Sequence, residues 1–336
     1  DNDFRASGSG MIDYNISDIP LNLIETSFKY TQKIGNLMSV TYDDIVNAQK
    51  AQGDVIRKTS LVFSDTFSQL TGSKVYLKNE FEQKTGSFKL RGAYYKIKNL
   101  AEDEKSKGVV AASAGNHAQG VALASAMEKI NCTIVMPRNA SPAKVAATKE
   151  YGAEVVLEGK NYDESWIKAQ EIAKTSGAQI IHAFDDPQII AAQGVIGLEI
   201  MEQLPNVDEI YVPIGGGGLA AGILIAVKTK NPNVKIIGVE SKSFPSMKNS
   251  LDSGKLETVD GGFTVADGMS VRTPGKQTFE IIRDMIDKIV LVDDEEIIKT
   301  IFLLMERSKV VVEPAGAAGL AYLVSKKPSP GKNVVP

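Results

Sequence analysis

Short apolar runs rich in β-branched residues alternate with longer segments of helical periodicity from about residue 74 onward. The predicted strands are 75–79, 109–113, 132–136, 154–158, 179–183, 209–213, 234–240 and 288–292. Apolar residues between them recur at helical spacing, for example over 163–175 and 187–201. This alternation predicts βαβ units and parallel sheets with helices on both faces.

The order of these segments predicts an α/β protein with two open, twisted parallel-sheet domains flanked by helices. We expect a smaller domain over 105–184, inserted into a larger domain built from 11–104 and 185–336. Residues 1–10, DNDFRASGSG, have the Ser/Gly-rich composition of a tag or linker, so we leave them out of the fold prediction.

Composition narrows the class of protein. The 336 residues are 43% hydrophobic and 24% charged, which is ordinary for a globular chain of about two domains. Lys and Arg number 38 against 41 Asp and Glu, so the chain lacks the basic excess typical of nucleic-acid binding. One cysteine and two histidines argue against a zinc site. No apolar run reaches the ~18 residues of a membrane span. We expect a cytoplasmic enzyme or binding protein without a metal, nucleic-acid or membrane partner.

Four consecutive glycines, Gly215 to Gly218, follow a predicted strand and open an apolar helix. Backbone N–H groups and the positive end of the helix make such a loop an anion site suited to phosphate. A P-loop is excluded because no Gly-Lys-Ser/Thr follows. Gly216, Gly218 and Ala221 also fit the dinucleotide pattern G-x-G-x-x-A. Glu240 ends the next strand at the required distance, so this pattern alone leaves a dinucleotide open.

A second candidate loop contains Ser87, Phe88 and Lys89. We expect Ser87 to cap a helix that begins near Phe88. Lys89 then lies in the first turn, where the positive helix end lowers its pKa and favours the nucleophilic amine. Spacing alone does not distinguish this arrangement from a solvated surface lysine.

A third loop, Ser113-Ala114-Gly115-Asn116-His117, again follows a predicted strand and opens a helix. A hydroxyl, an amide and an imidazole beside helix-terminal N–H groups form a suitable carboxylate site. An ordinary capped helix is the alternative.

Other polar positions have structural interpretations. His182 lies in an apolar run and is expected to be a hydrogen-bonded core histidine, whereas Asp185 and Asp186 indicate a turn and a helix cap. No G-x-S-x-G motif is present, which argues against a serine hydrolase.

Taken together, the loops resemble those of the fold-type II pyridoxal-phosphate enzymes, and within them the threonine/serine dehydratase (threonine ammonia-lyase) family. The matching segments are TGSFKLRGA (85–93), SAGNHAQG (113–120), AAQGVIGLEI (191–200), IGGGGLAAG (214–222), ADG (266–268) and EPAGAAGLA (313–321). The resemblance extends from about residue 40 onward, in the family's order. It implies a tryptophan synthase β-like fold, pyridoxal 5′-phosphate as cofactor, and a homodimer or homotetramer.

The resemblance also implies residue roles. Lys89 is expected to hold the cofactor as a Schiff base and to act as the catalytic base. The implied cofactor-binding residues are Phe88, Lys89, Asn116, Gly215, Gly216, Gly217, Gly218, Leu219, Gly268 and Glu313. The implied substrate-binding residues are Ser113, Ala114, Gly115, Asn116 and His117. The glycine loop would then bind the cofactor phosphate, and the dinucleotide pattern is coincidental.

The implied reaction removes water and then ammonia from a small amino acid that carries a side-chain hydroxyl. L-Threonine would give 2-oxobutanoate, and L-serine would give pyruvate as a secondary reaction. Eukaryotic serine racemases carry a second hydroxyl at the position of Ala114, which has no proton to give, so we expect elimination to dominate. A serine racemase-like or other fold-type II enzyme is the alternative, followed by a dinucleotide-binding domain or an inactive ligand sensor. No metal is predicted near Glu240, because its loop offers no second acid.

The C-terminal residues depart from the family pattern. The family has a Ser-Gly-Gly-Asn segment soon after a late apolar strand, and its hydroxyl or thiol meets the pyridine nitrogen of the cofactor. Here the sequence ends with Asn333-Val334-Val335-Pro336, which is expected to form that strand. We therefore expect the partner of the pyridine nitrogen to lie beyond Pro336.

Overall fold

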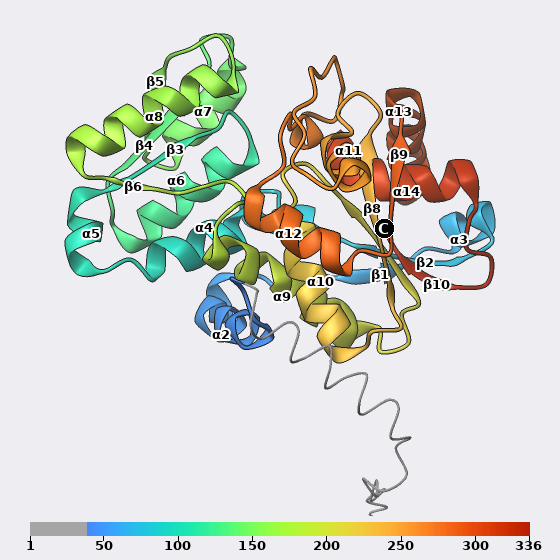
Figure 1. Cartoon of the computed structure of the whole chain (residues 1–336). Coiled ribbons are helices and arrows are strands. Elements are labelled where there is room, and N and C mark those ends of the chain that lie inside the picture. Colours follow the sequence, from blue (N-terminus) through green and yellow to red (C-terminus); the bar gives the residue numbers. More distant parts are fainter. Residues whose placement is uncertain (1–38) are drawn as a thin grey trace, which may run out of the picture. The chain divides into compact units, whose positions relative to one another are not determined.

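Two β-sheets organise residues 39–336, the part of the chain that the computed structural model describes (Figure 1). One sheet has six strands and the other has four. The predicted tag at residues 1–10 lies outside the described residues. Within them, no helix is long and apolar enough to cross a membrane.

The four-stranded sheet is wholly parallel. Its strands are β3 (Val109–Ala112), β4 (Cys132–Met136), β5 (Glu154–Leu157) and β6 (Gln179–Ile180). They lie in the order β5-β4-β3-β6, with Val109 opposite Cys132 and Gln179 on its two sides. The helices of this region are α5 (Glu102–Lys107), α6 (Asn116–Glu128), α7 (Pro142–Glu150) and α8 (Tyr162–Ser176).

The six-stranded sheet takes its strands from both flanks of that region. They are β1 (Leu61–Phe63), β2 (Lys74–Lys78), β7 (Glu209–Pro213), β8 (Lys235–Ser241), β9 (Lys288–Val292) and β10 (Asn333–Val335). The order is β1-β2-β10-β7-β8-β9, and every pair except β1–β2 is parallel. The predicted strand at the C-terminal residues is therefore confirmed, and it lies between β2 and β7.

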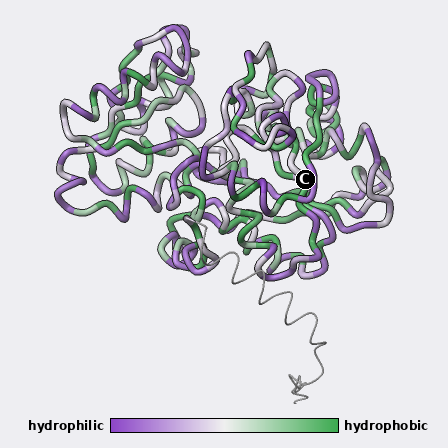
Figure 2. The backbone as a smooth tube through the Cα atoms, viewed as in Figure 1, coloured by the Kyte–Doolittle hydropathy of each residue, from purple (hydrophilic) through white to green (hydrophobic). Residues whose placement is uncertain are grey.

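The remaining helices come from the two flanks of the small-sheet region in the sequence. They are α2 (Tyr42–Gln52), α3 (Asp65–Thr71), α4 (Lys89–Lys98), α9 (Pro187–Gln203), α10 (Gly218–Lys230), α11 (Ser246–Ser253), α12 (Lys276–Met285), α13 (Asp294–Leu303) and α14 (Pro314–Lys326). Short helical turns are η2 (Gly53–Val55), η3 (Glu80–Glu82), η4 (Asp267–Met269) and η5 (Leu304–Ser308). Helices α9 and α10 are apolar and buried along most of their length and pack against each other. Figure 2 colours the backbone by hydropathy, with hydrophobic residues in green.

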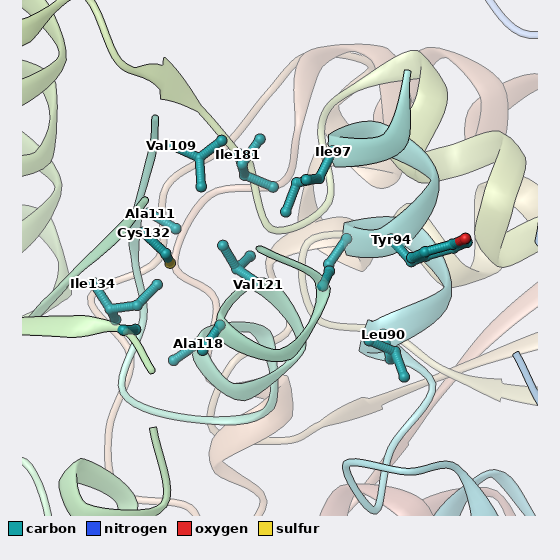
Figure 3. Close-up of a cluster of buried hydrophobic side chains, with 14 of the residues drawn as sticks. Leu90, Tyr94, Ile97, Val109, Ala111, Ala118, Val121, Cys132, Ile134 and Ile181 are labelled. Carbon is teal, nitrogen blue, oxygen red and sulfur yellow. The ribbon is translucent and has the colours of Figure 1, made fainter. Parts of the chain in front are cut away.

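Helix α4 packs against α6, a helix of the four-stranded-sheet region. Leu90 and Ile97 of α4 are fully buried in a cluster with residues of β3, α6 and β4 (Figure 3). The apolar face of α4 points into this cluster, and the helix also contacts α9. The helix that begins with Lys89 is therefore fixed between α6 of the small-sheet region and α9.

The predicted α/β fold class is confirmed, with two corrections. The large sheet is not wholly parallel, because β1 pairs antiparallel with β2. A strand as short as β1 leaves no alternating pattern in the sequence, and it was not predicted. The predicted strand 179–183 is too long, since β6 ends at Ile180 and the chain turns at His182. Strands β3 to β6 lie inside the range 105–184 and the other six lie outside it, while the exact domain boundaries stay a prediction.

Candidate active site

The glycine loop joins β7 to α10 and exposes backbone donors. Gly217 is the N-cap of α10 and has a φ of +95°, a left-handed conformation that glycine adopts without strain. Within residues 39–336, the N–H groups of Gly215, Gly216 and Gly217 donate no hydrogen bond. Gly216 and Gly217 are buried. Because buried N–H groups are nearly always paired, these donors are suited to an anionic ligand.

Neighbouring side chains fix the shape of this loop. A Cβ atom at Gly216 would overlap the aromatic ring of Phe184. On the other side, the Thr278 hydroxyl donates to the Gly216 carbonyl at 2.6 Å, and the Gly275 N–H donates to the same oxygen at 3.3 Å. The loop is therefore held by contacts that leave its N–H groups free.

Lys89 is the first residue of α4, as predicted. Its Nζ donates to the Ala183 carbonyl at 2.8 Å and lies 5.3 Å from the centre of the Phe88 ring. Burial lowers the pKa of Lys89 to about 8, and the Glu313 carboxylate opposes this shift. With this pKa, about a tenth of the lysine is the neutral, nucleophilic amine at pH 7, far more than for an ordinary lysine.

The predicted helix cap by Ser87 is wrong. Phe88 is the N-cap residue of α4, and no side chain caps this helix. The Ser87 hydroxyl is buried without a hydrogen-bond partner among the described residues, as is that of Thr85. Ser87 precedes the N-cap position by one residue, so its hydroxyl does not accept a hydrogen bond from the first N–H groups of α4.

The segment 181–186 contacts all three candidate loops; we call it the connecting segment. The Ile181 carbonyl lies 2.8 Å from His117 Nε2, and the Ala183 carbonyl accepts from Lys89. Phe184 then packs on the glycine loop. This segment leads from β6 to α9 and brings together loops that are far apart in sequence.

Polar residues of the connecting segment fix its own turn. His182 Nδ1 accepts hydrogen bonds from the N–H groups of Phe184, at 3.2 Å, and Asp185, at 2.8 Å. His182 is thus hydrogen-bonded as predicted, but it is only partly buried and lies in a turn, not in the core of a strand. Asp186 caps α9, as expected. Asp185 instead caps the distant helix α12, accepting from Gln277 N at 2.9 Å, which sequence reasoning did not predict.

The third loop contributes Asn116 and His117 at the start of α6. Asn116 Nδ2 donates to Glu313 Oε1 at 2.6 Å, so these two predicted cofactor-binding residues are in direct contact. Burial, together with the positive charge of Lys89, lowers the pKa of His117 to about 3, so its imidazole is neutral and donates to the Ile181 carbonyl. Ser113 Oγ accepts from the Gly115 N–H at 3.2 Å.

Glu313 and Gly268 complete the set of predicted residues. Burial raises the pKa of Glu313, and the hydrogen bond from Asn116 opposes that shift. Gly268 lies against the glycine loop, because its carbonyl oxygen would be 2.8 Å from a Cβ atom built on Gly215. The structure therefore brings the following predicted residues into one region: Phe88, Asn116, Gly215, Gly268 and Glu313.

A cavity of about 410 Å³ adjoins this region. Ser87, Phe88, Leu219 and Glu313 line it. The remaining wall is mainly apolar and includes Ile196, Ile200, Ile210, Ile223, Leu304 and Val310. Lys89, Asn116 and the four glycines do not line this cavity, so it extends beside the predicted site and does not coincide with it.

Glu240 has a structural role that disfavours the dinucleotide interpretation. Its buried carboxylate accepts from the N–H groups of Met247 and Lys248 at 2.8 Å each, at the start of α11. Burial raises its pKa to about 7 against these hydrogen bonds. Both oxygens are engaged by the chain itself, and so they are not placed to bind a ribose. Within residues 39–336, no group of three or more His, Cys, Asp or Glu residues could hold a metal ion.

A family of enzymes combines these loops in this order. The sequence profile described as "Pyridoxal-phosphate dependent enzyme" matches residues 53–335, and the chain belongs to this family. The L-threonine ammonia-lyase of Thermotoga maritima is 50% identical over 295 residues, which cover 88% of this chain and 74% of that protein. A catabolic L-threonine dehydratase of Escherichia coli is 48% identical over 290 residues, covering 86% of this chain and 88% of that protein. The resemblance predicted from the motifs is confirmed.

Solved structures are similar in fold. A maize serine racemase superposes with a TM-score of 0.86 at 35% identity, covering 88% of this chain and 92% of that one. The processed threonine deaminase isoform 2 of Solanum lycopersicum superposes with a TM-score of 0.83 at 38% identity, covering 88% and 87%. The fold is therefore that of the fold-type II enzymes.

The residues of this chain fit pyridoxal 5′-phosphate, the cofactor of the family. The free N–H groups of Gly215 to Gly217 are suited to its phosphate. The unpartnered hydroxyls of Thr85 and Ser87 are further donors, and Lys89 supplies the amine for its aldehyde. These groups would suit a phosphate at one end of the cofactor and an aldehyde at the other.

Proposed function

We propose that this protein is a threonine ammonia-lyase that converts L-threonine into 2-oxobutanoate and ammonia, with L-serine to pyruvate as a slower reaction. The observation that carries the proposal is the connecting segment, which contacts the Lys89 amine through the Ala183 carbonyl and the glycine loop through Phe184. The relatives named as threonine ammonia-lyase or dehydratase support the choice of substrate.

Each loop then has a distinct task. The N–H groups of the glycine loop bind the phosphate, and the loop from Ser113 to His117, which leads into α6, orients the substrate carboxylate. Lys89 takes the proton from Cα, because burial already favours its neutral amine. The bound cofactor withdraws electrons from Cα and thereby makes that proton acidic. His117 is neutral and fixed to the backbone, so we assign it a positioning task and no proton transfer.

Ala114 bears on the alternative of a serine racemase, which similarity to the maize enzyme raises. Racemisation needs a proton donor on each face of Cα. Lys89 serves one face, whereas the methyl group of Ala114 has no proton to give, at the position where eukaryotic serine racemases have a hydroxyl. We therefore infer that elimination is favoured over racemisation.

The experiment follows the products of purified protein loaded with pyridoxal 5′-phosphate. With L-threonine we expect 2-oxobutanoate and ammonia in equal amounts, measured by keto-acid derivatisation and an ammonia assay. With L-serine we expect pyruvate at a lower rate and little D-serine by chiral chromatography. Conversion of L-serine mainly to D-serine would replace the proposal with a racemase, and absence of any keto acid from a cofactor-loaded protein would overturn it.

We further infer a homodimer or homotetramer in the cytoplasm. The family resemblance supports the oligomer, and the acidic composition with few cysteines supports the location. Light scattering of the loaded enzyme tests the first inference, and a monomer at micromolar concentration would contradict it.

A further inference from the structure

Arg91 is fully buried and makes a double fork with two carboxylates. It lies on α4, two positions after Lys89. Its Nη1 and Nη2 donate to the two oxygens of Glu199 at 2.7 and 3.0 Å. Its Nε and Nη2 donate to the two oxygens of Glu80 at 2.9 and 2.8 Å. Such bidentate pairs fix direction as well as distance, because the guanidinium is planar.

Lys78 completes what we call the arginine cluster, defined as Lys78, Glu80, Arg91 and Glu199. Lys78 Nζ donates to Glu199 Oε2 at 2.6 Å. The exposed fractions of the four side chains are 4%, 16%, 0% and 5% in that order. Two cations and two anions balance, so the cluster carries no net charge into the interior.

The cluster joins four separate elements. Lys78 ends β2, Glu80 begins η3, Arg91 belongs to α4 and Glu199 to α9. The pKa of Lys78 is lowered by burial, against the attraction of Glu199, and that of Arg91 is raised by the two carboxylates despite its burial. The ionised form of each residue in the cluster is stabilised by the opposite charges of its neighbours. Moving any one of the four elements would therefore break hydrogen bonds to a desolvated charge.

The cluster also determines the rotation of α4 about its axis. Successive side chains of a helix point about 100° apart. The Leu90 side chain is buried in the apolar cluster that includes residues of β3, β4 and α6 (Figure 3), whereas the Arg91 side chain is directed to Glu80 and Glu199. With these two directions fixed, the direction of Lys89 is fixed as well, toward the Ala183 carbonyl.

We propose that Arg91 is a positioning residue, which holds α4 in the rotation that presents the Lys89 amine to the cofactor aldehyde. The inference rests on the proposed cofactor chemistry, in which Lys89 Nζ attacks the aldehyde carbon, a C=N bond forms and water leaves. Arg91 contacts neither reacting group, and it acts through the backbone of the first turn of α4. The fork geometry matters here, since a lysine in its place would keep the charge but lose the two planar pairs.

The test uses Arg91→Lys and two ligands. Pyridoxine 5′-phosphate has no aldehyde, so its dissociation constant reports the pocket without Lys89. Pyridoxal 5′-phosphate reports the covalent step, followed by absorbance and by borohydride reduction with peptide mapping of Lys89. We expect the first constant to change less than about twofold. The rate of covalent attachment should fall about 10- to 100-fold, as for other small misplacements of reacting atoms.

One control variant and a second test variant complete the design. The buried Lys228 pairs with the exposed Asp287 at 2.6 Å, at the far end of α10 from the glycine loop, so Lys228→Arg exchanges a buried cation away from α4. We expect it to leave the attachment rate unchanged. Glu80→Gln keeps one fork of Arg91 on Glu199 and should reduce the rate less than Arg91→Lys does. If Arg91→Lys does not fold, Glu80→Gln decides the question with the same two ligands.

The outcomes are distinguishable. A wild-type rate in Arg91→Lys and in Glu80→Gln would overturn the positioning role and leave the proposed function intact. An equal decrease in pyridoxine 5′-phosphate affinity and in the rate of covalent attachment would also overturn it, since the cluster would then only stabilise the fold. A wild-type protein that binds pyridoxal 5′-phosphate without modifying Lys89 would overturn the proposed function itself.

Discussion

The glycine loop and the lysine loop meet at the same site but are built on opposite principles. The glycine loop offers backbone N–H groups, and side chains would obstruct it, as the overlap between a Cβ atom at Gly216 and the Phe184 ring indicates. The lysine loop offers a single side-chain amine, whose pKa and direction depend on its surroundings. Added side-chain atoms should therefore disrupt the glycine loop, whereas removal or reorientation of the Lys89 amine should disrupt the lysine loop.

The supports of the two loops differ in the same way. The glycine loop is held by neutral contacts, a hydroxyl from Thr278 and a ring from Phe184. The lysine loop is held by the apolar anchor Leu90 and by the buried charges around Arg91. We therefore expect the proposed phosphate binding and the proposed proton transfer to be disturbed separately.

Replacement of Lys89 separates the two loops most strongly. In Lys89→Ala we expect threonine turnover to fall at least about 10²- to 10⁴-fold, the range for loss of a general base. The absorbance change on mixing with pyridoxal 5′-phosphate should also be lost. The affinity for pyridoxine 5′-phosphate should change little, because the glycine loop is intact.

Lys84 provides the matched control, as an exposed lysine of the same loop. Lys84→Ala should retain both turnover and the absorbance change. Turnover in Lys89→Ala close to that of the wild type would assign the chemistry to another residue.

An added methyl group at Gly216 tests the opposite loop. We expect Gly216→Ala to lower the free energy of unfolding by about 1–3 kcal/mol, the usual cost of overpacking. It should also weaken binding of both pyridoxal and pyridoxine 5′-phosphates, since the loop must move away from Phe184. Thermal unfolding and fluorescence titration measure these effects.

Gly262→Ala is the comparison, because Gly262 is exposed and a Cβ atom there meets only the Ser243 Cβ at 3.9 Å. It should leave stability and both affinities near those of the wild type. Weakened pyridoxal 5′-phosphate binding in Gly216→Ala with unchanged pyridoxine 5′-phosphate binding would place Gly216 beside the aldehyde and contradict its assignment to the phosphate loop.

The two loops also differ in how far the sequence predicts them. The glycine loop is a local motif, and its place between a strand and a helix follows from adjacent residues. The lysine loop is only partly local: Lys89 begins a helix as predicted, but the expected cap by Ser87 fails because it depends on the turn geometry. Its main support, Glu199, lies 108 positions from Arg91.

Long-range pairs of this kind leave no periodic signal in one sequence. Asp185 caps a helix that begins 91 positions later, with Lys276, and it was expected to serve its own turn. The sequence Asp185-Asp186-Pro187 predicts a helix cap, but it does not show that the two carboxylates cap different helices. Periodicity thus predicts the elements and local motifs predict the loops, whereas the partners that align them depend on the tertiary fold.

The smallest effect we expect comes from pH, and it should act on one loop only. The folded pKa of Lys89 is about 8, below its ordinary value of 10.5, because burial disfavours the ammonium form. Attack on the cofactor aldehyde requires the neutral amine. Its rate should therefore rise with pH and level off above about pH 9, with a value at pH 7 about tenfold below that plateau. Stopped-flow absorbance of the cofactor-free protein measures this rate.

The same shift fixes the sign of the stability change. Between pH 8 and 10.5 the unfolded chain keeps the Lys89 proton that the folded chain has lost, so the stability contributed by this group rises with pH over that interval. Lys89→Met should remove that rise. Backbone N–H groups do not titrate here, so pyridoxine 5′-phosphate affinity should stay nearly constant from pH 7 to about pH 9. A parallel change in both quantities would mean that the glycine loop also depends on the charge of Lys89, and the two loops would then act as one unit.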